Sequence, residues 1–206
     1  MNQYLISIFN AVGIDVNHLR KEYLSANELM HLNKALQSEQ DLEQHFYTGE
    51  HGENLECLLF FLHSHKNDII KLMQGKGREE TLIELYTSST ISGGYDCFRF
   101  NLSKFPQTYT QNNQVMTLYR IGRDGECEGN LGCSWAKSID GLRAYCDASN
   151  LSRSILESKP IFVITIDDSQ VLFEGKESEQ ELVLKPNFTH HTLAMLDDEL
   201  RSKVGR

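Results

Sequence analysis

Three short segments in the second half of the chain carry side chains that could act together on a phosphorylated substrate. They are Tyr119-Arg120 at the end of an apolar run, Ser134-Trp135-Ala136, and Glu179-Gln180-Glu181 followed by aliphatic residues. An arginine can clamp a phosphate through its planar fork of donors. A serine hydroxyl can orient a carboxylate or a ribose, and a carboxylate can stabilise positive charge that develops in a transition state. Such groups suit a dinucleotide that carries a pyrophosphate and a cleavable glycosidic bond to nicotinamide.

Each segment alone also has a simpler interpretation. Residues two apart in a strand point to the same face, so Glu179 and Glu181 would place like charges together, which favours a solvated face. Arg120 could be a surface residue at a strand end, and Trp135, the only tryptophan, could pack in the core. In the functional interpretation, the two glutamates grip a hydroxyl and stabilise an oxocarbenium ion, as paired carboxylates do in glycoside hydrolysis.

Taken in this order, the three segments resemble the Arg-Ser-Glu pattern of the ADP-ribosyltransferase superfamily. Tyr119-Arg120 resembles its strand-borne Y-R element, Ser134-Trp135-Ala136 stands where the family often has S-T-S, and Glu179-Gln180-Glu181 resembles its E-x-E element. The similarity covers roughly residues 115–186, about a third of the chain. The sequence departs from the pattern at Trp135 and Ala136, which replace hydroxyl residues, and at Ile121, where glycine is common.

The resemblance implies that NAD is the co-substrate and assigns a role to each residue. Glu181 would stabilise the oxocarbenium ion, and Glu179 would position or deprotonate the acceptor. Ser134 would hold the catalytic glutamate and the nicotinamide ribose. The implied cofactor-binding residues are Tyr119, Arg120, Ser134, Trp135 and Tyr145. Arg120 would contact the phosphates, and Tyr145 could stack on nicotinamide or, alternatively, pack in the core.

The resemblance therefore predicts an NAD-dependent mono-ADP-ribosyltransferase that modifies a target protein. A bacterial effector, a toxin or a phage-encoded modifier of a host protein would fit this size. Two alternatives remain open: a non-catalytic, acidic, protein-binding inhibitor built on the same scaffold, and an NAD glycohydrolase that uses water as the acceptor.

Apolar residues at helical spacing predict that the first half of the chain is helical. The predicted helices are one ending before Gly13, one begun by a capping box of Ser25 and Glu28, a long one over residues 54–74 and a short one over residues 78–86. Residues 87–94 are rich in serine, threonine and glycine and predict a break between two halves.

The second half reads as strands with one or two short helices. Strands are expected over residues 115–121, 160–166, 170–173 and 180–184, a loop over 122–132, a helix over 138–148 and a helical tail over 192–203. We therefore predict an α+β protein. Its helical N-terminal region spans residues 1–90, and a mixed, mostly antiparallel β-sheet domain similar to ADP-ribosyltransferases spans residues 91–206.

Composition narrows the classes of partner. The chain has 206 residues and a formal net charge of −9, which argues against general nucleic-acid binding. The charge would favour docking to a basic protein surface, although solubility alone also explains it. The five cysteines form no CxxC pair and no spacing indicates a metal site, so we expect reduced thiols and no metal. We see neither an apolar run of about 20 residues nor a basic leader, which predicts a cytoplasmic protein, of a host cell if it is an effector.

Overall fold

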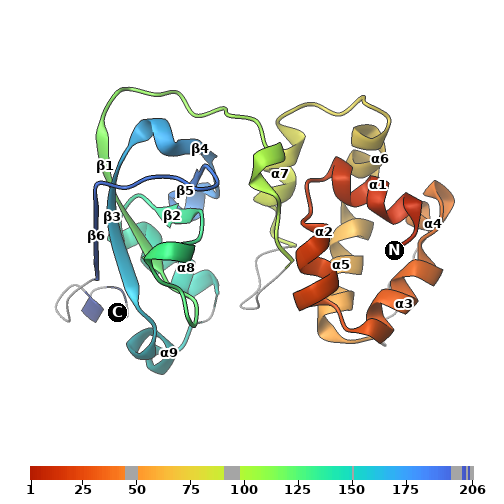
Figure 1. The fold of residues 1–206 in the computed structure, drawn as a ribbon, viewed down its shortest axis with the longest axis horizontal. Coiled ribbons are helices and arrows are strands. Elements are labelled where there is room, and N and C mark those ends of the chain that lie inside the picture. The colour runs from red at the N-terminus through yellow and green to blue at the C-terminus, as the bar shows by residue number, and fades with distance from the viewer. Residues whose placement is uncertain (45–50, 91–97, 150, 196–200, 203, 205–206) are drawn as a thin grey trace. The chain divides into compact units, whose positions relative to one another are not determined.

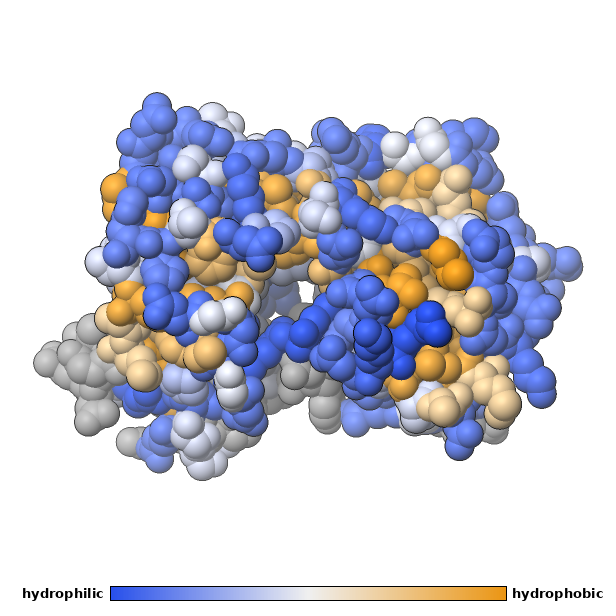
Figure 2. All heavy atoms as spheres, in the orientation of Figure 1, coloured by the Kyte–Doolittle hydropathy of each residue, from blue (hydrophilic) through white to orange (hydrophobic). Residues whose placement is uncertain are grey.

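The computed structural model describes residues 1–44, 51–90, 98–149, 151–195, 201–202 and 204. The chain divides into unit 1, residues 1–105, and unit 2, residues 106–206 (Figure 1). Unit 1 is helical and unit 2 contains an antiparallel six-stranded sheet, which confirms the predicted α+β class. On the face drawn in Figure 2, hydrophilic residues predominate on each unit, with apolar patches among them.

Unit 1 is built from short helices around one apolar core. Its helices are α1 (Gln3–Ala11), α2 (Val16–His18), α3 (Ala26–Ala35), α4 (Glu39–Glu43), α5 (Glu53–Ser64), α6 (Lys66–Met73) and α7 (Thr81–Tyr86), with a π-helical turn η1 (Leu19–Tyr23) and a 3-10 turn η2 (Leu102–Lys104). The core contains the two apolar stripes seen in the sequence, Leu5, Ile8, Phe9 and Val12 on one helix and Leu55, Leu58, Leu59 and Leu62 on another.

The long helix predicted over residues 54–74 is wrong in one respect, because the chain breaks at His65 into α5 and α6. His65 leaves helical geometry with φ −109° and ψ 14°. Its ring packs against Phe61 and bonds the hydroxyl oxygens of Ser88, at 2.7 Å, and Thr90, at 3.1 Å. The apolar stripe runs on across the break, so periodicity alone does not reveal a bend fixed by partners more than twenty residues away.

The capping box predicted at Ser25 and Glu28 is confirmed and serves two helices. Ser25 Oγ accepts from the Glu28 amide at 3.3 Å, and Glu28 Oε2 accepts from the Ser25 amide at 2.8 Å. The other carboxylate oxygen, Oε1, accepts from the amide of Leu55 at 3.3 Å, in the first turn of α5. One glutamate thus satisfies orphan amides at two helix starts.

Replacing Ser25 by alanine is expected to lower the free energy of unfolding of unit 1 by about 1 kcal/mol, because the Glu28 amide loses its cap. Urea titration followed by far-UV circular dichroism measures the change. Ser7→Ala is the matched control, since the Ser7 hydroxyl only donates to the Gln3 carbonyl within α1. Equal effects of the two substitutions would show that the cap contributes nothing specific.

Residues 98–105 belong to unit 1, so the boundary lies at 105/106 rather than at the predicted 90/91. Phe98 is buried in the core of unit 1, and Phe100 pairs with Ile14 in an isolated antiparallel bridge. The Phe105 ring fills the space where a Cβ at Gly13, φ +73°, would lie. These aromatic residues complete the helical core. Aromatic residues alternate in the sequence over residues 95–100, of which residues 95–97 lie outside the described residues.

Unit 2 is organised on a sheet with strand order β4-β5-β2-β1-β3-β6, in which every described neighbouring pair is antiparallel. The strands are β1 (Val115–Ile121), β2 (Ser134–Ala136), β3 (Ile161–Asp167), β4 (Val171–Glu174), β5 (Glu181–Leu184) and β6 (Thr192–Met195). The helices are α8 (Ile139–Ala148) and α9 (Arg153–Ser158), and 3-10 turns are η3 (Glu128–Asn130), η4 (Asp168–Gln170) and η5 (Glu177–Glu179).

The predicted helical tail is wrong at its start, because residues 192–195 form the edge strand β6 along β3. The Thr165 and Thr192 hydroxyls hydrogen-bond across this pair at 2.7 Å. Pairing with a neighbouring strand is a tertiary effect that outweighs the local helical pattern. Residues 196–200 lie outside the described residues, and Arg201 and Ser202 are helical.

The sheet has two faces, which we name by what packs on each. On the helix face, Tyr119, Ala136 and Val163 pack with Leu142 and Cys146 of α8. On the loop face, the buried members include Leu118, Trp135, Phe162 and Leu182. Because side chains alternate along a strand, each residue of β1, β2 and β5 can be assigned to one face from its neighbours.

Candidate functional site

The three segments singled out from the sequence lie on adjacent strands of unit 2. Arg120 is the penultimate residue of β1, Ser134 begins β2, and Glu181 begins β5. Ala136 pairs with Glu181, so Ser134, two residues earlier, is the diagonal neighbour of Glu181. Both side chains therefore lie on the helix face, and the diagonal spacing is within reach of a glutamate.

The Glu181 carboxylate is held at both oxygens. The Ser134 hydroxyl donates a short hydrogen bond to Oε1, and the Lys176 amide donates to Oε2 at 2.9 Å. A Cβ at Gly175 would overlap the carboxylate, so a larger residue at this position would displace the Glu181 side chain. The carboxylate is thus fixed in one orientation, as a group that stabilises charge in a transition state must be.

Burial raises the pKa of the Glu181 carboxyl, and the nearby charge of Glu179 adds to the rise. The hydrogen bonds from Ser134 and from the Lys176 amide, together with the Lys176 ammonium, act in the opposite direction without cancelling it. A pKa raised by desolvation beside a second carboxylate is typical of functional carboxyl pairs.

The expectation that Glu179 and Glu181 share one face of a strand is wrong. Glu179 ends the 3-10 turn η5, Gln180 adopts the left-handed conformation with φ 48°, and the strand begins only at Glu181. Glu179 is instead ion-paired with Lys176, with Nζ 3.1 Å from Oε1. Like-charge repulsion is thereby relieved by a cation that the strand interpretation did not include.

The turn through Gln180 is fastened to the start of α8. The Lys137 amide donates to the Gln180 carbonyl at 3.0 Å, and the Ser138 hydroxyl donates to Gln180 Oε1 at 2.7 Å. Ser138 is also the N-cap of α8. A Cβ at Gly141 would lie 2.5 Å from the Glu179 carbonyl oxygen, so helix and turn pack in backbone contact.

Gly141→Ala is expected to lower the free energy of unfolding of unit 2 by about 1–3 kcal/mol, because the added methyl overpacks this contact. Helix propensity alone would make the alanine variant more stable by about 1 kcal/mol. A measured loss of stability would therefore come from the overpacked contact. Gly129→Ala is the control, since nothing lies within 4 Å of a Cβ there. Guanidinium titrations of both variants measure the effect, and a Gly141→Ala variant as stable as wild type would contradict it.

Arg120 lies on the opposite, loop face and is engaged by a residue that the sequence did not point to. Its Nε and Nη2 donate to the Glu126 carboxylate at 2.8 and 3.2 Å. Its Nη1 donates to the Ser134 carbonyl at 2.8 Å. The Arg120 and Glu126 side chains are only 10% and 4% exposed, so this is a buried bidentate ion pair.

Glu126 collects further donors from its own loop. The amides of Gly132 and Arg123 donate to it at 2.6 and 2.8 Å. Burial alone would raise the pKa of the Glu126 carboxyl, but the hydrogen bonds and charge of Arg120, with these two amides, hold the pKa below its ordinary value. The only signal in the sequence is an acidic residue in the glycine-rich loop six residues after Arg120.

Ser134 connects the two halves of the site. Its carbonyl oxygen accepts from Arg120 on the loop face, and its hydroxyl donates to Glu181 on the helix face. The arginine, serine and glutamate named from the sequence therefore form one hydrogen-bonded chain through the sheet, although their charged groups do not line a common face.

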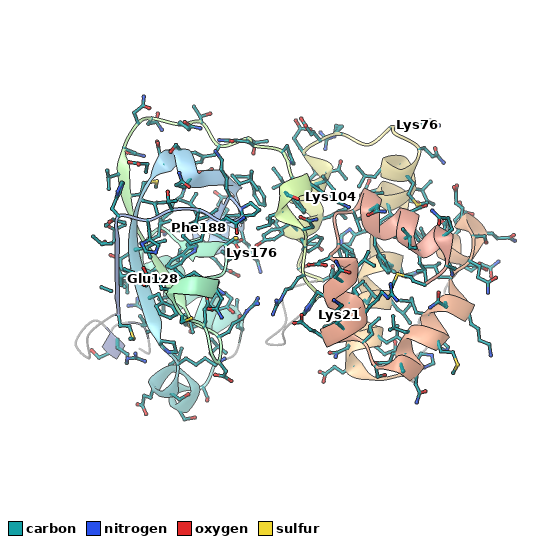
Figure 3. The ribbon with its side chains drawn as sticks, viewed as in Figure 1. Lys21, Lys76, Lys104, Glu128, Lys176 and Phe188 are labelled. Carbon is teal, nitrogen blue, oxygen red and sulfur yellow. The ribbon has the colours of Figure 1, made fainter. Side chains whose placement is uncertain are left out.

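The aromatic residues named from the sequence lie in different surroundings. Trp135 is 1% exposed on the loop face, donates to the Gly132 carbonyl at 2.8 Å and contacts Phe188 edge-on, in agreement with the core interpretation. Phe188 is labelled in Figure 3. Tyr119 is partly buried in the helix-face core. Tyr145 of α8 is 40% exposed, so its ring is accessible rather than in the core.

Comparisons with protein-family models, with curated proteins and with solved structures gave no match. Among the described residues, no set of three or more His, Cys, Asp and Glu side chains is placed to hold a metal ion. None of the described helices has the length and apolar character needed to cross a membrane. A cavity of about 220 Å³ in unit 1 is lined by polar residues that include the ion pairs Lys71–Asp68 and Arg78–Glu84.

Proposed function

We propose that this protein is an NAD-dependent ADP-ribosyltransferase that modifies a protein, with its site at Ser134 and Glu181 in unit 2. The observation that carries the proposal is the hydrogen-bonded chain from Arg120 through Ser134 to the buried Glu181 on three adjacent strands. The resemblance of these three segments to the Arg-Ser-Glu pattern names the reaction. The raised pKa of Glu181 also supports a functional carboxyl.

In this reaction the bond between nicotinamide nitrogen and ribose C1′ breaks, and its electron pair leaves with nicotinamide. The leaving group departs neutral, so it needs no acid. The oxocarbenium ion that forms is stabilised by the ionised Glu181, whose orientation Ser134 fixes. A nucleophilic side chain of the target then bonds to C1′ and gives its proton to Glu179. Tyr145, exposed on α8, stacks on the nicotinamide ring.

Arg120 binds the NAD pyrophosphate in this proposal, and Glu126 now holds the guanidinium fork that a phosphate would use. Exchange of the two anions is therefore part of NAD binding. The exchange is chemically matched, because an arginine fork accepts carboxylate and phosphate oxygens in the same planar geometry.

A second candidate function is a non-catalytic protein-binding module, and the same ion pair favours it. If Glu126 never releases Arg120, no phosphate clamp forms. The net charge of −9 then suits docking on a basic protein surface. NAD glycohydrolysis is the variant of the first proposal in which water replaces the target side chain.

The deciding experiment incubates the full chain with NAD labelled in the adenylate part and a cell lysate, beside the Glu181→Ala variant. Label on a discrete protein band with wild type alone supports transfer and identifies the target. Free nicotinamide without labelled protein supports glycohydrolysis. Intact NAD, together with no NAD binding by calorimetry, overturns the enzymatic proposal in favour of the binding module.

A further inference from the structure

Lys176 contacts both glutamates of the candidate site, and nothing in the motif pattern points to it. It lies between β4 and β5, immediately before η5 (Figure 3). Its main-chain amide donates to Glu181 Oε2 at 2.9 Å, and its ammonium group is 3.1 Å from Glu179 Oε1. Lys176 thus holds Glu179 through the charge of its side chain and Glu181 through its main-chain amide.

Main-chain hydrogen bonds hold Lys176 in place within the turn between β4 and β5. Its carbonyl oxygen accepts from the amides of both Glu179 and Glu181, each at 3.1 Å. The Gly175 amide donates to the Glu181 carbonyl at 2.9 Å, which closes the turn from the other side. The Lys176 and Glu179 side chains are only 26% and 12% exposed, so solvent screens their interaction less than that of a surface pair.

Two carboxylates that both contact Lys176 repel each other, which favours protonation of one of them unless a cation balances the charge. Neither Lys137 nor Cys146, whose surroundings the structure describes, supplies that cation. Lys137, at the end of β2, is paired with Glu174 of β4 at 2.6 Å. Cys146 of α8 is a neutral thiol, because burial, Asp147 and Glu179 raise its pKa to about 12.

We propose that Lys176 is the positioning residue of the Glu179–Glu181 pair, and that its ammonium group holds Glu179 in place and favours the ionised form of the buried Glu181. The electrostatic role stands on the contacts of Lys176 alone. Its consequence for catalysis rests on the proposed transferase function, in which only ionised Glu181 stabilises the oxocarbenium ion. Lys176 itself touches no reacting atom.

Carboxyl NMR titration of the full chain, with carbon-13 in the glutamate side chains, tests this role without any substrate. Lys176→Met removes the cation and keeps the amide, so the midpoint of Glu181 titration moves to higher pH. Glu179→Gln removes the neighbouring negative charge, so the midpoint moves to lower pH. Lys176→Arg keeps the charge and restores the wild-type midpoint, and Lys137→Met is the control for loss of an unrelated lysine.

Shifts of opposite sign for Lys176→Met and Glu179→Gln support the proposal, since a purely structural role predicts no such reversal. An unchanged Glu181 midpoint in either variant overturns it, and Glu179→Gln keeps the test valid if Lys176→Met fails to fold. The rate of nicotinamide release is measured separately as a function of pH. The acidic limb of this pH–rate profile should move with the midpoint of the Glu181 titration. Opposite shifts without any release by wild type would leave the role of Lys176 standing and remove the transferase function.

Discussion

Replacing Glu126 by alanine is expected to destabilise unit 2 by about 3–5 kcal/mol. The substitution leaves the Arg120 guanidinium, only 10% exposed, without its carboxylate partner. Removal of one member of a buried ion pair has a cost of this size because the remaining charge stays desolvated. The amides of Gly132 and Arg123 lose their acceptor at the same time, which adds to the loss.

Denaturant titration followed by the fluorescence of Trp135, the only tryptophan and part of the core of unit 2, measures this effect. Glu128→Ala is the matched control, because Glu128 lies in the same loop, is 72% exposed and is 3.8 Å from His190. Arg120→Met combined with Glu126→Leu should recover part of the stability, since no charge then remains buried. A Glu126→Ala variant as stable as the control would show that Arg120 readily gives up this partner.

The sign of the pH dependence follows from the lowered pKa of Glu126. A carboxyl whose folded pKa lies below its unfolded value, about 4.3, contributes its full stability above that value. The contribution is lost as the pH falls through the folded pKa. Wild type should therefore lose more stability on acidification than Glu126→Gln, whose side chain does not titrate.

Much of the fold is predictable because local patterns coincide with tertiary burial. The capping box at Ser25, the apolar run over residues 115–121 and the helix over residues 138–148 all appear where the sequence places them. The exceptions share one cause. The helix breaks at His65, whose ring bonds hydroxyl groups distant in sequence, and residues 192–195 pair with β3. In both cases a tertiary contact outweighs the helical pattern of the local sequence.

The sequence predicted that Arg120, Ser134 and Glu181 act together but did not predict how their side chains are arranged. The sheet brings the three residues to adjacent strands, and their role as a site stays a prediction. The faces on which the side chains lie depend on register, and a shift by one residue reverses them. The register places the Arg120 side chain on the face of the sheet opposite to that of Glu181. The left-handed conformation of Gln180 keeps Glu179 out of the strand. Glu126 and Lys176 lie in turns, where no periodic pattern marks a partner.

The positions of Arg120 and Glu181 on opposite faces of the sheet restrict how the proposed co-substrate NAD could bind. Ser134 is the only one of the three motif residues whose polar atoms bond both others, through its carbonyl and its hydroxyl. A dinucleotide that reaches both Arg120 and Glu181 would therefore have to pass the end of the sheet at which β1 ends and β2 begins, near Ser134. Release of Arg120 by Glu126 would free the guanidinium for this path, so the stability of that ion pair and the affinity for NAD should vary inversely.

Under the proposed transferase function, Glu181→Gln is expected to reduce nicotinamide release by about 100-fold or more, and it should make unit 2 more stable at neutral pH. The rate falls because the neutral amide no longer stabilises the oxocarbenium ion, and loss of one preorganised electrostatic group has an effect of this size. Stability rises because a carboxyl with a raised pKa stabilises the fold below its unfolded value, about 4.3, and loses that contribution as the pH rises through the folded pKa.

Glutamine can keep the local hydrogen bonds, because its oxygen can accept from the Lys176 amide while its nitrogen donates to the Ser134 hydroxyl. The rate and stability effects are therefore separable by measuring release kinetics and denaturant midpoints at two pH values, one neutral and one below the unfolded pKa. The stability gain should disappear at the lower pH, where Glu181 is protonated in both states. Undiminished release by Glu181→Gln would exclude Glu181 as the catalytic group, whereas a stability gain at both pH values would show that packing, and not burial of charge, limits the wild type.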